Sequence, residues 1–507
     1  MLSALSVLVG FASVSTSACK VTEQDIDTWK GTRKGPGKMV AVVLADKFTP
    51  ELRSYAALEL VEMDRQDVDG VTEMHRAIQK LDAESRGRIV HDVADGLIAL
   101  MNTPATAGSS GAAGANGSDA NAAVSPHQVR AKDAAFLLAG DAPPEVREKL
   151  IGAVVGWYTA DFNDRSLAGN FSAEQVVRGL GAVAASKLID ALNAQLPQAA
   201  LIKLAELIGQ LGDTATRQRA GQRLVQIEHE MEGSVFLNWL KAQIAAQLKQ
   251  SGSAPDAARV AKAAELNREN FISNGAIPAM KYLADQPEVR KRLLEIAGAK
   301  DPALTERRTR ALQALEGKVG PDQLDEVLAL ALDNNNPAAV RDYAFDRVGD
   351  IRSPQALASM WPLLQSDDER LRWRAGELIL AIGGTGVLSE FFDKLPSGLG
   401  VTYEPEELDG YAQRMAQMTP APRQYALAQL QSPNWWDNVI GLSYFQRKGS
   451  DADIALMEPL KGNSSPVRGK RWEKADTVGT VAERATAGLR ERLKDAAGAN
   501  APGAASH

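Results

Sequence analysis

The chain has 507 residues, of which 45 % are hydrophobic, 24 % charged and only 5 % aromatic, and its formal net charge is -7. This length exceeds what one compact core holds, so it predicts several domains or one extended repeat array. Abundant alanine and scarce aromatic residues favour packed helices over sheets. The acidic balance argues against a nucleic-acid-binding surface dominated by lysine and arginine. We therefore expect an all-α protein without a nucleic-acid partner.

The first 18 residues carry no charged side chain and contain an apolar run from Leu5 to Phe11, followed by small and hydroxyl residues. This pattern is typical of a signal peptide. The run is shorter than the roughly 20 apolar residues that span a bilayer, and we expect no later segment to be apolar over that length. The sequence therefore predicts export without a membrane-spanning helix.

Cys19 is the only cysteine, which excludes an intrachain disulfide and a site built from several thiolates. The run Thr16-Ser17-Ala18-Cys19 resembles the lipobox of bacterial lipoproteins, a family that usually has leucine where this chain has Thr16. The resemblance implies that Cys19 is the lipid attachment site. Lys20, rather than aspartate, resembles lipoproteins sorted onward, which implies the periplasmic side of the outer membrane. A secretory peptide cleaved near Ala18 and an incidental cysteine are the alternatives.

Composition and helical periodicity divide the chain into segments. They are a signal peptide (1–18), a lipid-anchored tether (19–37), N-terminal helical repeats (38–101), a flexible linker (102–128), helical repeats (129–249), a short break (250–256), C-terminal repeats (257–494) and a disordered tail (495–507).

A loose repeat places an aliphatic residue and then an arginine at successive helix starts, with alanine three residues after several of these arginines. Arg308, Arg341 and Arg372 recur at intervals of roughly 30 residues, a spacing typical of stacked helix pairs. These segments look like HEAT repeats, which implies an α-solenoid of antiparallel helix pairs. We expect its arginines to form a structural ladder between repeats rather than a row of ligand-binding groups. The ladder comprises Arg53, Arg147, Arg290, Arg341 and Arg372.

Motifs that carry chemistry are scarce. The five histidines are scattered, and Gly179-Leu180-Gly181-Ala182-Val183-Ala184 follows a helix-capping pattern at Ser172 rather than a strand, so it does not predict a dinucleotide site. Glu406-Glu407 fits a helix start, where negative charge is favourable. The sequence predicts no catalytic residue, no metal site and no cofactor, and therefore no enzyme.

Large rings gather near the C-terminus in a chain that has few of them. Trp435, Trp436 and Tyr444 lie close together in sequence, and Trp472 stands among Arg468, Lys470, Arg471 and Lys474. Adjacent helical residues point about 100° apart, so one tryptophan of the pair could face solvent. The four rings are candidate partner-binding residues, and two faces of a packed helix pair are the alternative. The basic cluster fits a solvated helix face or a site for an anionic partner.

These observations favour an envelope-tethered scaffold or adaptor that binds a protein or peptide along the face of a helical array. An enzyme or enzyme-assisting HEAT-like subunit of the lyase type is the alternative, and a clustered set of buried titratable groups in one cleft would support it. A structural spacer is a third interpretation.

Overall fold

The computed structural model describes residues 20–63, 68–103, 124–160, 162–398 and 400–499. The chain divides into two compact units, Met1–Val289 and Arg290–His507, which are described separately. The described residues contain helices and no strand, and an isolated antiparallel bridge joins Pro466 and Thr477. The predicted all-α fold is confirmed.

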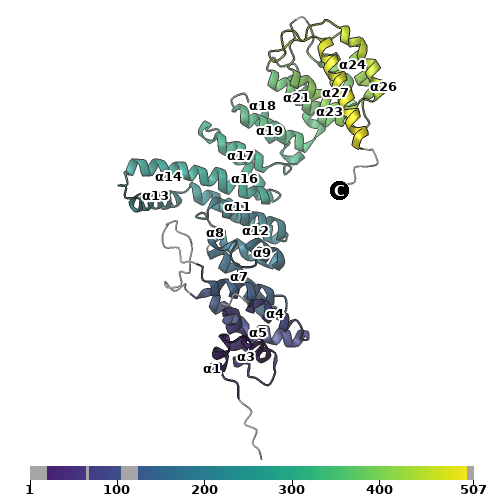
Figure 1. Cartoon of the computed structure of the whole chain (residues 1–507). Helices are drawn as coiled ribbons and strands as arrows, with labels where there is room; N and C mark the ends of the chain where they lie inside the picture. Colours follow the sequence, from purple (N-terminus) through teal and green to yellow (C-terminus); the bar gives the residue numbers. More distant parts are fainter. Residues whose placement is uncertain (1–19, 64–67, 104–123, 161, 399, 500–507) are drawn as a thin grey trace, which may run out of the picture. The chain divides into compact units, whose positions relative to one another are not determined.

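The first unit consists of helices that follow one another along the chain (Figure 1). They are α1 (Glu23–Lys30), α2 (Gly35–Leu44), α3 (Pro50–Glu62), α4 (Gly70–Ile78), α5 (Ala83–Asn102), α6 (Pro126–Leu138), α7 (Pro144–Ala160), α8 (Phe162–Arg165), α9 (Ala173–Leu180), α10 (Ala182–Leu188), α11 (Gln198–Leu211), α12 (Thr214–Glu232), α13 (Ser234–Gln250), α14 (Ala257–Phe271) and α15 (Ile277–Met280). A π-helical turn (Ile272–Ala276) joins α14 to α15.

The second unit repeats the same design. Its helices are α16 (Pro287–Ala297), which starts at the boundary, α17 (Thr305–Ala314), α18 (Leu324–Leu332), α19 (Ala338–Ile351), α20 (Leu357–Leu363), α21 (Glu369–Gly383), α22 (Leu388–Lys394), α23 (Pro405–Gln417), α24 (Arg423–Leu430), α25 (Trp435–Lys448), α26 (Asp451–Met457) and α27 (Val478–Ala499). The second helices of successive pairs, α17, α19, α21, α23, α25 and α27, pack on one another in chain order. This is the stacking of HEAT-like helix pairs.

The helix starts follow the predicted signals. Pro50 and Pro144 are the first residues of α3 and α7, where the missing proline N–H costs nothing. Ser172 and Gln175 form the predicted capping box of α9. Gly384 caps the C-terminus of α21 with a φ of 56°, a left-handed conformation that glycine adopts without strain.

Some segment boundaries differ from the expectation. The segment 19–37, expected to be a tether, contains α1 and the start of α2, because Thr22 and Asp25 form a capping box and Ile26 is fully buried. The last residues of the expected linker 102–128 belong to α6, which begins at Pro126. The break expected at 250–256 separates α13 from α14, and α27 continues to Ala499. Figure 1 shows the α13–α14 hairpin extending away from α11 and α12.

One stretch contradicts the expectation that no later segment is apolar enough to cross a membrane. Residues Glu369–Lys394 are long and apolar enough by length and composition alone, a test that buried helices of soluble proteins also pass. Here the stretch forms α21 and α22 with a turn between them, and α21 packs on α19, α20 and α23. The stretch therefore belongs to the packed helix pairs of the second unit.

Candidate functional site

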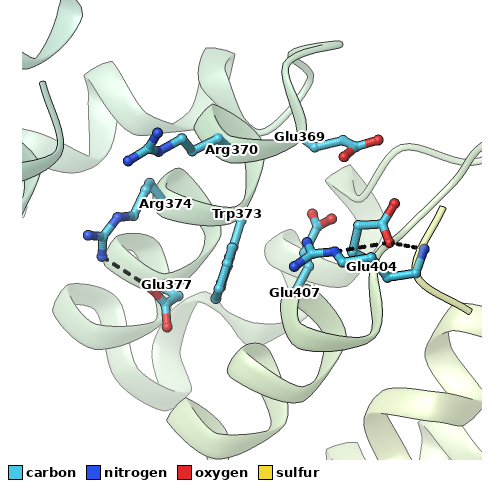
Figure 2. A pocket seen from close by; sticks show the side chains of 8 residues that line it. Glu369, Arg370, Trp373, Arg374, Glu377, Glu404 and Glu407 are labelled. Atoms are coloured by element: carbon cyan, nitrogen blue, oxygen red, sulfur yellow. Dashed lines mark hydrogen bonds and ion pairs between the residues drawn. The ribbon is translucent and has the colours of Figure 1, made fainter. Parts of the chain in front are cut away.

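A cavity of about 470 Å³ lies in the second unit between α21, the start of α23 and the segment that precedes α27. Its wall is almost entirely ionisable, apart from one indole ring. The lining residues are Glu369, Arg370, Trp373, Arg374, Glu377, Glu404, Glu407 and Arg471 (Figure 2).

Helix α21 supplies most of this wall because of its periodicity. Asp368 caps the helix by accepting from the backbone N–H groups of Arg370 and Leu371. Positions 370, 373, 374 and 377 are three or four residues apart and therefore share one face. The opposite positions, including Ala375 and Ile379, are fully buried. The helix thus turns a charged face with one tryptophan toward the cavity.

Beneath the cavity, Arg372 of α21 and Glu407 of α23 form a buried ion pair. The Arg372 Nε and Nη2 atoms each donate to a Glu407 carboxylate oxygen at 2.8 Å, and Nη2 also donates to the Thr402 carbonyl at 3.0 Å. The Tyr411 hydroxyl donates to Glu407 at 2.9 Å. Burial raises the pKa of Glu407, although the Arg372 guanidinium lowers it. Glu407 therefore lies in the first turn of α23, as the sequence predicts for Glu406-Glu407, and it is also buried and paired.

Glycine allows the two helices to approach closely at this pair. A Cβ atom on Gly376 would lie 2.4 Å from the Tyr411 ring, so the tyrosine occupies the space that a side chain would fill. A Cβ atom on Gly410 would lie 2.8 Å from the Trp373 Nε1 atom. Both contacts place the aromatic rings against helix backbone, which brings Trp373 to the edge of the cavity.

Glu404 anchors the segment before α27. Its carboxylate is 2 % exposed and accepts from the backbone N–H groups of Lys470 and Arg471 at 2.8 and 2.9 Å. Burial raises the pKa of Glu404, but these two amides and the Arg471 guanidinium outweigh it and hold the pKa below its usual value. The Trp472 indole N–H donates to the Tyr403 carbonyl at 2.8 Å. The basic cluster therefore sits on an ordered loop, not on the helix face expected from sequence.

The structure brings Trp435, Trp436 and Trp472 into one cluster, in which Trp435 and Trp436 pack inward. Trp435 and Trp436 are 9 % and 5 % exposed, and Tyr444 is 2 % exposed. Tyr403 and Trp472 cover Trp435, with ring centroids 6.1 and 6.5 Å away. Neither tryptophan of the pair faces solvent, because α25 is enclosed by α23, α24 and α27. Trp472 is half-buried at the edge of this cluster, and Tyr444 stacks edge-on against Phe445.

The five motif arginines take different positions. Arg53 and Arg341 each donate from Nε to a carbonyl in the last turn of the preceding helix, at 3.1 and 3.2 Å. The Arg308 Nε atom likewise donates to the Ala297 carbonyl in the last turn of α16, at 2.9 Å. This contact satisfies a carbonyl that a helix end leaves without a partner and places a cation at the negative end of its dipole.

The other members of the predicted ladder differ. Arg372 reaches the next helix pair through Glu407, as expected of a ladder. Arg147 is exposed on α7, and Arg290 is half-buried on α16. The contact of Arg372 thus joins successive helix pairs, whereas those of Arg53 and Arg341 lie within one helix pair.

Ion pairs connect the second helices beside the cavity. Arg370 pairs with Asp342, and Arg374 pairs with Asp346 at 3.2 Å, which joins α21 to α19. Glu377 lies 3.7 Å from both Arg374 and Arg414, and Arg447 pairs with Asp409 at 2.6 Å. The result is a band of alternating charge across α19, α21, α23 and α25.

Sequence reasoning missed Trp373, Glu377 and Glu404. The signal for the first two was present, because 370, 373, 374 and 377 share a helical face that carries charge and one ring. No local signal marks Glu404, whose partners are more than 60 positions away. Cys19 lies outside the described residues. Within them, no group of three or more His, Cys, Asp or Glu side chains is placed to hold a metal ion.

Together, the helix pairs define the class of the protein, an all-α repeat protein with HEAT-like pairs. No family model matches the chain, and no curated protein matches it. Among solved structures, the chain is similar to Kap121p bound to Pho4p, with 13 % identity, 94 % of this chain and 48 % of that chain covered, and a TM-score of 0.34. For Kap121p bound to Nup53p the values are 13 %, 94 %, 47 % and 0.37. The chain spans about half the length of these structures, and its fold assignment rests on its own helix pairs.

Proposed function

We propose that this protein is a lipid-tethered adaptor of the bacterial cell envelope that binds a protein partner at the charged cavity on α21 and α23. The tether is Cys19, whose surroundings resemble a lipobox. Triacylation would hold the chain at the periplasmic side of the outer membrane, because two or more acyl chains anchor a protein stably.

The lining of the cavity carries the binding proposal. Small-molecule pockets are lined mainly by apolar side chains with few polar groups. This cavity is lined by seven ionisable side chains and a tryptophan, and it continues into the charged band of α19, α21, α23 and α25. Tryptophan and arginine are enriched at protein interfaces. The chemistry of the wall therefore favours a polypeptide over a small apolar ligand.

Photo-crosslinking in intact cells tests the binding site. A crosslinking amino acid replaces Arg370, whose side chain is 59 % exposed at the cavity, and a matched control variant carries it in place of the exposed Asp325 of α18. We expect a discrete crosslinked protein from position 370 and none from position 325. Equal crosslinking at both positions, or none at position 370, contradicts the proposal.

The tether is tested by mass spectrometry of the mature N-terminus and by fractionation of cells that carry Cys19→Ser. We expect a lipidated cysteine in the wild type and release of the variant from the membrane fraction. A variant that remains with the membranes, or an unmodified wild-type cysteine, contradicts the lipid anchor.

One observation bears on the alternative of a lyase-type enzyme. Glu407 is a buried carboxyl in the cavity wall, as an acid–base residue of an enzyme would be. An acid–base residue must exchange a proton with its substrate. Both Glu407 oxygens instead accept from Arg372, and one also accepts from Tyr411. This arrangement favours a structural role for the carboxyl and a binding role for the cavity.

A further inference from the structure

The basic and acidic side chains of the cavity wall differ in the ion-pair partners that they have. Arg370 and Arg374 pair with Asp342 and Asp346 of α19, and Arg471 pairs with Glu406 at 3.2 Å. None of these three carboxylates lines the cavity. Arg374 also lies 3.7 Å from Glu377, and Arg471 lies 3.4 Å from Glu404, and both of these carboxylates line the cavity. Each cation of the wall therefore has at least one carboxylate partner outside the wall.

The carboxylates of the wall are less completely satisfied. The oxygens of Glu377 lie 3.7 Å from Arg374 and Arg414, beyond hydrogen-bond distance. Glu369 lies 3.4 Å from the Lys470 Nζ atom, whose side chain is 85 % exposed, and such surface pairs hold weakly. Glu377 and Glu369 thus retain capacity to accept hydrogen bonds from a cation.

An aromatic ring stands between these carboxylates. Figure 2 shows the Trp373 indole across the cavity from Glu404 and Glu407, with Glu377 on its other side and Glu369 above. The face of an indole attracts a cation electrostatically, and arginine both stacks on it and pairs with carboxylates through its planar fork of donors. The compact ammonium group of lysine is not planar and cannot stack on the indole in this way.

We propose that the cavity binds the guanidinium of an arginine side chain of the protein partner, stacked on one face of Trp373 and paired with the carboxylate on that side of the ring, Glu369 or Glu377. This inference rests on the proposed function, because it names the chemical group by which the partner is recognised. The occupant is an arginine within a polypeptide, not free arginine.

Fluorine NMR of the full chain labelled with 5-fluorotryptophan tests this directly. The chain has 8 tryptophans, and the Trp373→Phe variant identifies the Trp373 signal. The probes are acetyl-arginine amide, its neutral isostere acetyl-citrulline amide, acetyl-lysine amide, acetyl-glutamate amide and free arginine. We expect acetyl-arginine amide to shift the Trp373 signal at lower concentration than the other amides, and free arginine to bind no more tightly.

Charge-neutral variants test the carboxylates. Glu377→Gln together with Glu369→Gln should weaken acetyl-arginine amide about fivefold or more, the loss of roughly 1 kcal/mol of charge pairing. Glu390→Gln removes one exposed carboxylate of α22 that pairs with Lys394, and it should leave the affinity unchanged. Thermal unfolding checks that all variants remain folded.

Several results overturn the inference. They are no shift of the Trp373 signal with acetyl-arginine amide, equal binding of the citrulline probe, stronger binding of the glutamate probe, tighter binding of free arginine, or unchanged affinity in the double glutamine variant. Crosslinking at position 370 without arginine binding refutes this inference and leaves the adaptor function standing. Arginine binding without a crosslinked protein supports the pocket chemistry and refutes the adaptor function.

Discussion

Each unit contains a buried ion pair, and the two pairs differ in what surrounds them. In the first unit, Lys132 and Asp133 are 0 % and 2 % exposed, and they hold the segment 166–172. The Lys132 Nζ atom donates to the Ala168 and Phe171 carbonyls at 2.9 and 2.8 Å, and the Asn170 N–H donates to Asp133 at 2.8 Å. All of these partners belong to one connecting segment.

In the second unit, Arg372 and Glu407 join two successive helix pairs, and Glu407 also lines the cavity. A buried charge is costly unless it is paired, so both clusters stabilise the fold only while they are complete. The comparison shows that a buried ion pair alone does not mark a binding site. The cavity chemistry comes from the half-buried Trp373 and Glu377 above the pair.

The largest expected effect is the loss of the cross-repeat pair. Arg372→Met leaves Glu407 buried without its cation, and we expect the second unit to lose about 3–5 kcal/mol of stability. Denaturant unfolding, with hydrogen exchange of the α21 and α23 amides, measures it. The double variant Arg372→Met/Glu407→Leu should recover most of the loss, because it removes both charges. A single variant within about 1 kcal/mol of the wild type would refute the pairing.

Removing the cation of the first unit should cost less. Lys132→Met leaves the buried Asp133 carboxylate without its cation and the Ala168 and Phe171 carbonyls without their donor. Asp133 keeps its hydrogen bond from the Asn170 N–H, and the segment around Leu167, itself 83 % exposed, can take up water. We expect a loss of about 2 kcal/mol and faster amide exchange confined to 166–172. The same variant should bind acetyl-arginine amide like the wild type. A loss of that binding would mean that the two pairs do not act separately.

A smaller effect tests the close approach of α21 and α23. Gly376→Ala places a methyl group against Tyr411, and we expect a net loss of about 1–2 kcal/mol despite the better helix propensity of alanine. Gly156→Ala in α7 is the matched control, because nothing lies within 4 Å of its Cβ position. That variant should gain up to about 1 kcal/mol. Thermal unfolding compares them, and equal shifts would contradict the tight contact.

The smallest effect concerns pH. The folded-state pKa of Glu404 lies below its usual value of 4.5, so the folded state binds its proton less readily than the unfolded state does. The stability that Glu404 contributes is therefore present above pH 4.5 and is lost as the pH falls through the lowered pKa. Hydrogen exchange at the Lys470 and Arg471 amides should accelerate over that acidic range. Glu404→Gln should remove this pH dependence, and a wild-type rate that stays flat would contradict it.

The local features of this fold were readable from the sequence. Proline and serine at helix starts, glycine after α21 and the recurring arginine motif act within a few residues of one another, so their patterns predict helices and their ends. The helical repeat class follows from the same patterns, because their spacing of about 30 residues matches one pair of helices. Helix α1 was also encoded locally, by Thr22, Asp25 and Ile26, although its segment was expected to be a tether.

Only the tertiary structure decided which faces are covered. Trp435 and Trp436 point in different directions from α25 and are both buried, because neighbouring helices and the Trp472 loop enclose that helix on several sides. Glu407 meets Arg372 and Glu404 meets the Lys470 amide across 35 and 66 positions. Trp373 stays half-buried at the cavity edge because its face of α21 is only partly covered by the described residues. Such contacts depend on how repeats stack, which residue spacing within one helix does not encode.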